Sequence, residues 1–137
     1  MGASKETLVE VYYKQVRSVL EYASVVWNGG LKLDDVLKIE RVQKSACSII
    51  LGASYSSYEE ACHILHFKKL SERRKELALK FATKASRHPI HSKWFIENPT
   101  EQYTRLKKPT YKPACGRTER FLSSAIPYLT NLLNETK

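Results

Sequence analysis

An apolar pattern at the start of the chain constrains the fold more than any other feature. Its members recur three or four residues apart, which is the spacing of one helix face and not of a strand. They are Leu8, Val11, Tyr12, Val16, Val19, Leu20, Ala23, Val26 and Trp27. Ser4 is placed to cap the N-terminus, and Asn28-Gly29-Gly30 offers residues that adopt left-handed conformations at a helix end. The pattern therefore predicts a helix from about Lys5 to Trp27.

Similar patterns predict three more helices. A continuous apolar stripe predicts a helix over Leu33–Leu51, which forms an antiparallel hairpin with the first helix. Ser57 and Glu60 form a capping box that opens a short helix, and Ser71 caps another from about Glu72 to Ser86. The chain is therefore predicted to be all-α, a helical hairpin plus two shorter helices.

The last third of the chain has a different composition. Trp94-Phe95-Ile96 is expected to be a buried anchor, and residues 97–120 contain three prolines among mostly polar residues, which predicts an extended, irregular segment. The apolar pattern resumes over Phe121–Asn134 with Pro127 inside it, so short helical turns are expected. We expect two parts: a helical bundle over residues 1–96, and a basic arm over residues 97–137 whose apolar turns pack on that bundle.

The charge is distributed unevenly along the chain. Residues 1–66 carry 7 Lys/Arg and 8 Asp/Glu, whereas residues 67–137 carry 16 and 6. A concentration of basic residues favours a polyanionic partner, with nucleic acid first and a membrane surface second. The alternative is a basic face that only keeps the protein in solution.

The strongest site signal is the segment from Arg105 to Arg120. Its Lys and Arg side chains can neutralise phosphates, and interleaved aromatic rings can stack on unpaired bases. A second basic patch lies at the start of the fourth predicted helix, where cations oppose the helix dipole. The predicted phosphate contacts are Arg73, Arg74, Lys75, Lys107, Lys108, Lys112, Arg117 and Arg120, and the candidate stacking residues are Tyr103 and Tyr111.

Other chemistry finds little support in the sequence. The pairs Cys62/His66 and His88/His91 have spacings seen in metal ligands, but no second cysteine pair accompanies them, so we expect neither a metal site nor a cofactor. No phosphate-binding glycine loop, nucleophile elbow or zinc-protease motif is present, which predicts a non-enzyme. Three irregularly spaced cysteines and the lack of a membrane-spanning apolar run favour an intracellular protein, nuclear or cytoplasmic.

Several motifs occur in the same order as in a known protein family. Residues 8–28 read L-V-E-V-Y-Y-K-Q-V-R-S-V-L-E-Y-A-S-V-V-W-N, and I-E-R-V-Q-K at 39–44 is followed by I-I-L-G at 49–52. Y-E-E-A at 58–61, L-S-E-R-R at 70–74 and R-T-E-R-F-L-S-S-A-I-P at 117–127 come next in order, with L-L-N at 132–134. This text resembles the region after the polymerase core in reverse transcriptases of non-LTR (LINE-type, jockey-like) retrotransposons.

The resemblance implies a thumb and C-terminal extension, a helical bundle that grips the template–primer duplex in the full polymerase. The palm aspartates are absent from this sequence, and Ala125 stands where the family often has an aromatic residue, so polymerase activity is not carried over. The chain is expected to be a fragment, a relic or a short reading frame from such an element. Its expected partners are RNA, DNA or hybrid duplex, and the remainder of a reverse transcriptase.

We therefore predict non-catalytic nucleic-acid binding with little sequence preference. The rival interpretation is a protein-interaction or dimerisation module, which an exposed apolar stripe of Val9, Tyr13 and Val25 would favour. A third is a foldable but unused relic of a mobile element.

Overall fold

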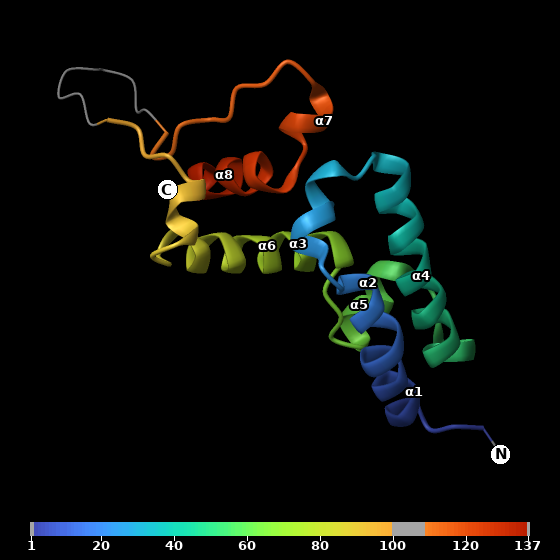
Figure 1. The fold of residues 1–137 in the computed structure, drawn as a ribbon. Coiled ribbons are helices and arrows are strands. Elements are labelled where there is room, and N and C mark those ends of the chain that lie inside the picture. The colour runs from blue at the N-terminus through green and yellow to red at the C-terminus, as the bar shows by residue number, and fades with distance from the viewer. Residues whose placement is uncertain (1, 100–108, 137) are drawn as a thin grey trace. The chain divides into compact units, whose positions relative to one another are not determined.

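The structure is a computed structural model that describes residues 2–99 and 109–136 (Figure 1). Helices dominate the described residues, and the extended pairing among them is limited to an isolated antiparallel bridge between Glu97 and Tyr111. The all-α prediction is confirmed.

The contacts of the chain divide it into two compact units. Unit 1 consists of Met1–Ser24 and Leu31–Arg74, and unit 2 of Val25–Gly30 and Lys75–Lys137. These are not the expected segments 1–96 and 97–137. The second half of α6 shares a core with the C-terminal helix, so residues 75–96 group with the C-terminal part of the chain.

The first predicted helix is present but interrupted. It consists of α1 (Lys5–Val11), a π-helical turn η1 (Tyr12–Arg17), α2 (Ser18–Glu21) and α3 (Ser24–Trp27). A π turn holds more residues than an α turn, so the positions after it are rotated relative to the 3.6-residue pattern. Val19, which the pattern placed on the buried face, is accordingly 71% exposed.

The helix also ends differently from the prediction. The chain breaks at Ala23, which has a left-handed φ of 50°, and Asn28–Gly30 form a 3₁₀ turn, η2. Among the described glycines only Gly52 has a positive φ, so the left-handed ending expected at Gly29 and Gly30 is wrong. Gly29 lies instead against the side chain of Tyr128, where a Cβ atom would not fit.

The middle helices agree closely with the sequence. Helix α4 spans Leu33–Leu51 and packs against α1, in antiparallel directions as the hairpin prediction requires (Figure 1). It is followed by a 3₁₀ turn η3 (Gly52–Ser54) and by α5 (Tyr58–Ile64), whose Ser57 cap accepts a hydrogen bond from the Glu60 N–H at 3.3 Å. Helix α6 (Leu70–Ser86) begins before Ser71, because the Ser71 N–H donates to the Glu40 carboxylate at 2.7 Å.

The core of unit 1 forms where η1, α4 and α5 meet. Its buried members are Tyr12, Cys47, Ile50, Leu51, Ala61, Cys62 and Phe67. The Phe67 ring stacks on Tyr12 at a centroid distance of 4.7 Å. Burial raises the pKa of the Cys47 thiol to about 12, so this cysteine is held protonated and unreactive.

Unit 2 is built around one face of α6. The alanines on that face share a buried cluster with side chains of α8 (Ala125–Glu135). Its members are Ala78, Ala82, Ala85, Phe95, Tyr111, Leu129, Leu132 and Leu133. Pro127 falls in the first turn of α8, where the missing N–H costs no helical hydrogen bond. The turns of this region are η4 (His91–Trp94) and α7 (Glu119–Leu122).

The anchor expected at Trp94-Phe95-Ile96 is Phe95 alone. Phe95 is buried, whereas Trp94 is 40% exposed and Ile96 is 66% exposed. The described part of the predicted irregular segment runs beside this anchor: the Lys112 N–H donates to the Ile96 carbonyl at 2.7 Å, and the Asn98 N–H to the Thr110 carbonyl at 3.0 Å.

Candidate nucleic-acid interface

Three cations line an open groove on helix α6 in unit 2. Lys80 and Lys84 lie one turn apart on one face of α6 (Leu70–Ser86), and Arg87, the first residue after the helix, continues the i, i+4, i+7 spacing. Leu79 and Thr83 complete the groove. The opposite face of α6 carries the alanines of the unit 2 core, so core packing is what directs the three cations outward.

The electrostatics of this groove favour an anion. Like charges at i and i+4 repel on a helix surface, and all three side chains are exposed. Within the described part of the chain, no carboxylate comes within 4.0 Å of Lys80, Lys84 or Arg87. The helix dipole stabilises Lys84 and Arg87 near the C-terminus, but it does not remove their mutual repulsion. A phosphate chain along this face would do so.

The C-terminal part of unit 2 holds three of the cations predicted from the sequence. Lys112, Arg117 and Arg120 are exposed, and no described carboxylate pairs with any of them. Arg120 lies on α7, whose Thr118 cap accepts a hydrogen bond from the Phe121 N–H at 3.3 Å. These residues remain available for phosphate contacts, although they do not line the α6 groove.

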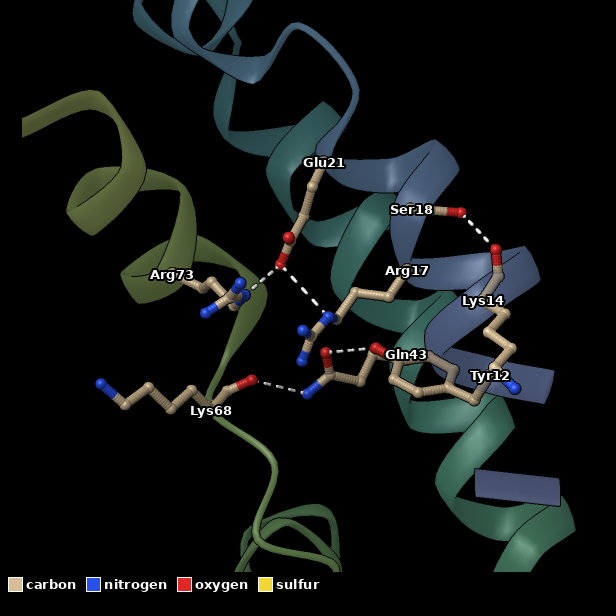
Figure 2. Close-up of polar contacts among 8 residues, drawn as sticks. All are labelled: Tyr12, Lys14, Arg17, Ser18, Glu21, Gln43, Lys68 and Arg73. Atoms are coloured by element: carbon tan, nitrogen blue, oxygen red, sulfur yellow. Dashed lines mark hydrogen bonds and ion pairs between the residues drawn. The ribbon is translucent and has the colours of Figure 1, made fainter. Parts of the chain in front are cut away.

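The basic patch at the start of α6 is organised differently from the expectation. In unit 1, the Glu21 carboxylate lies between Arg73, at 2.5 Å, and Arg17, at 3.5 Å (Figure 2). The Arg74 side chain is 1% exposed, and Lys75 pairs with Glu135 at 3.1 Å within unit 2.

The prediction that this patch is a phosphate-binding surface therefore needs correction. The Arg74 guanidinium is inaccessible to a nucleic-acid backbone, and Arg73 and Lys75 each pair with a carboxylate, Glu21 being shared between Arg73 and Arg17. Cations at the start of a helix, which oppose its dipole, are here explained by tertiary partners.

Glu21→Gln tests whether the ion pairs of Glu21 with Arg17 and Arg73 stabilise the fold. The Arg17, Glu21 and Arg73 side chains are only 14–28% exposed. Their ion pairs should therefore contribute a free energy between that of an exposed pair and that of a buried pair. We expect the substitution to lower the free energy of unfolding by about 1–2 kcal/mol, measured by urea denaturation. Glu10→Gln is the control, because Glu10 pairs with Lys14 at 68–70% exposure and its loss should cost under about 0.5 kcal/mol. Equal losses in the two variants would contradict a structural role for Glu21.

Tyr111 cannot stack on a base as predicted. Its ring is buried at 8% exposure and contacts Phe95 at a centroid distance of 5.9 Å. The Asn134 side chain both accepts from the Tyr111 N–H and donates to the Tyr111 carbonyl, each at 2.9 Å, which holds the tyrosine against α8. The predictions for Tyr103, Lys107 and Lys108 fall outside the described residues.

The sequence reasoning missed the α6 groove because it weighed clusters of adjacent basic residues above helical spacing. The i, i+4, i+7 recurrence of Lys80, Lys84 and Arg87 was the available signal. It also missed a column of aromatic rings after α6, formed by His88, His91 and Trp94.

The apolar stripe that would favour an interaction module does not exist as expected. Val9 and Tyr13 pack against the unit 1 core, and Val25 packs against the unit 2 core. Other apolar side chains are exposed on α4, including Leu33, Leu37 and Ile49.

No group of three or more His, Cys, Asp or Glu side chains placed to hold a metal ion occurs in residues 2–99 and 109–136. Over the same residues, no helix combines the length and apolarity needed to cross a membrane. No protein-family model, curated protein or solved structure matches this chain.

Proposed function

We propose that this protein binds nucleic acid without catalysis, through phosphate contacts made by the cationic groove of α6. The observation that carries the proposal is that Lys80 and Lys84 on α6, and Arg87 directly after it, line one groove without a described carboxylate partner. Unit 2 contains 12 Lys/Arg and 5 Asp/Glu, whereas unit 1 contains 11 and 9, so the long-range field attracts a polyanion to the same unit. Lys112, Arg117 and Arg120 are further phosphate contacts.

The resemblance to the thumb region of LINE-type reverse transcriptases supports the same function. In that proposal the chain derives from such an element and grips a template–primer backbone beside the rest of a polymerase. It works inside the cell, in the nucleus or cytoplasm, and recognises backbone charge rather than base sequence.

Fluorescence titration with a short DNA duplex and with an RNA–DNA hybrid tests the proposal. The logarithm of the binding constant should fall linearly with the logarithm of the salt concentration, by about 0.9 per phosphate contacted on B-DNA. Substituting Lys80, Lys84 and Arg87 together by glutamine should make that slope less steep by about 2.7, because three contacts are lost.

The matched control is the triple variant Lys32→Gln, Arg41→Gln, Lys44→Gln. All three control residues are exposed cations of unit 1, so the control removes the same formal charge from the other unit. Its salt slope should stay that of the unsubstituted protein. Equal slopes for the two triple variants would contradict a role for the α6 groove. Association that resists high salt in size-exclusion chromatography would favour an interaction module instead, with the exposed Leu33 and Leu37, one turn apart on α4, as its candidate surface.

A further inference from the structure

Three rings form a continuous stack at the C-terminal end of α6. His88 stacks on His91 at a centroid distance of 4.3 Å and an interplanar angle of 23°. His91 stacks in turn on Trp94 at 4.5 Å and 24°. His91 is therefore the middle ring, and Trp94 and His88 form the two ends of the column.

The backbone holds this column in place. The 3₁₀ turn η4 carries His91 and Trp94 three residues apart, and the buried Phe95 ties the end of that turn to the unit 2 core. The Ile90 N–H donates to His88 Nδ1 at 3.3 Å, and the Ser92 N–H to the His88 carbonyl at 2.9 Å. These contacts orient the His88 ring and the turn after it.

The column is exposed rather than part of a core. Trp94 is 40% exposed, and none of the three rings belongs to the buried cluster of unit 2. An indole that ends an exposed stack offers an apolar, polarisable surface to a further flat ring.

The charges flanking the column select the kind of ring that would stack there. Arg87, a lining residue of the α6 groove, directly precedes His88, and the exposed Lys93 directly precedes Trp94. Neither cation has a carboxylate partner among the described residues. Aromatic surfaces interleaved with unpartnered cations are the combination that binds single-stranded nucleic acid, because bases stack while the cations follow the phosphates.

We propose that Trp94 stacks on an unpaired base, so that the preferred ligand of unit 2 is a duplex with a single-stranded extension. This inference rests on the proposed function, since the α6 groove would hold the phosphates of the paired part. It adds a specific requirement for an unpaired base.

The test compares a blunt DNA duplex with the same duplex carrying a short single-stranded thymidine extension. The extension should raise the affinity of the unsubstituted protein by about 5- to 150-fold for each stacked base. Trp94→Leu should abolish this gain and leave the affinity for the blunt duplex unchanged, whereas Trp94→Tyr should retain most of the gain. Phe81→Leu is the matched control: Phe81 is also 40% exposed and lies on α6, but it is outside the column, so the gain should persist.

A second measurement does not depend on any variant. A 2-aminopurine base at the first unpaired position should lose fluorescence on binding the unsubstituted protein, because stacking quenches it. Equal affinity for both duplexes, or loss of the gain in His88→Ala but not in Trp94→Leu, would overturn the assignment to Trp94. Failure of the blunt duplex to bind with a steep salt dependence would instead overturn the proposed function, so the two failures are distinguishable.

Discussion

Replacing Gly29 by alanine is expected to lower the free energy of unfolding by about 2–3 kcal/mol, as overpacking does at a site that cannot relax. A Cβ atom at this position would lie 2.6 Å from Tyr128 Cβ, 2.7 Å from Tyr128 Cγ and 2.8 Å from the Ser123 carbonyl oxygen. These neighbours are backbone or the first atoms of a side chain, so no rotamer change removes the contact. Tyr128 is also held at its other end, because its hydroxyl accepts a hydrogen bond from Asn28 Nδ2 at 2.8 Å.

Gly30→Ala is the matched control for this prediction. It lies in the same 3₁₀ turn, but the nearest atom to its Cβ would be the Ser123 oxygen at 3.8 Å, an ordinary contact distance. Its free energy of unfolding should stay within about 0.5 kcal/mol of the unsubstituted protein. Urea denaturation followed by circular dichroism measures both variants. Similar stabilities for Gly29→Ala and Gly30→Ala would show that η2 does not pack closely against Tyr128.

Replacing Gln43 by leucine is expected to cost about 3 kcal/mol of the free energy of unfolding. Gln43 is 1% exposed, and its side chain bridges two segments of unit 1 (Figure 2). Its Oε1 accepts from the Tyr12 hydroxyl at 2.7 Å, and its Nε2 donates to the Lys68 carbonyl at 3.0 Å. Leucine fills a similar volume but satisfies neither group, and an orphaned buried hydroxyl costs about 1–3 kcal/mol.

A double-mutant cycle with Tyr12→Phe isolates the hydrogen bond between the two side chains. Burial raises the pKa of Tyr12, so the hydroxyl stays protonated and donates throughout the working range of pH. Tyr12→Phe alone should cost about 1–1.5 kcal/mol, and the double variant should cost about 1 kcal/mol less than the two single losses added together. Strict additivity, measured by urea denaturation, would mean that the two side chains do not interact.

Much of the helical structure could be predicted from local patterns. The bounds of α4 follow from its apolar stripe, and the start of α5 follows from Ser57, whose hydroxyl can satisfy an N–H group at the helix start wherever the helix packs. The start of α6 was misplaced because the carboxylate of Glu40, thirty-one residues before Ser71, accepts a hydrogen bond from the Ser71 N–H and so satisfies a group in the first turn of the helix.

The candidate site was much less predictable. Sequence alone does not separate a buried arginine from an exposed one, because Arg74 and Arg120 both follow charged residues in basic segments. Burial decides the difference: the Arg74 side chain is enclosed by protein, whereas Arg120 is exposed to solvent. The sequence likewise allows Tyr111 to be a stacking residue, but in the structure its ring contacts Phe95 and its backbone is hydrogen-bonded to Asn134.

The sequence by itself determined the all-α class, the location of the main helices and the positive charge of the second half. These properties depend on the local spacing of apolar residues, on capping side chains and on composition. Only the tertiary structure decided where the first helix breaks, which cations are balanced by carboxylates, and that Gly29 is needed for close packing rather than for a left-handed turn. The reason is physical: these outcomes depend on contacts between residues as far apart as Glu21 and Arg73, or Asn28 and Tyr128, and local patterns contain no information about such distant partners.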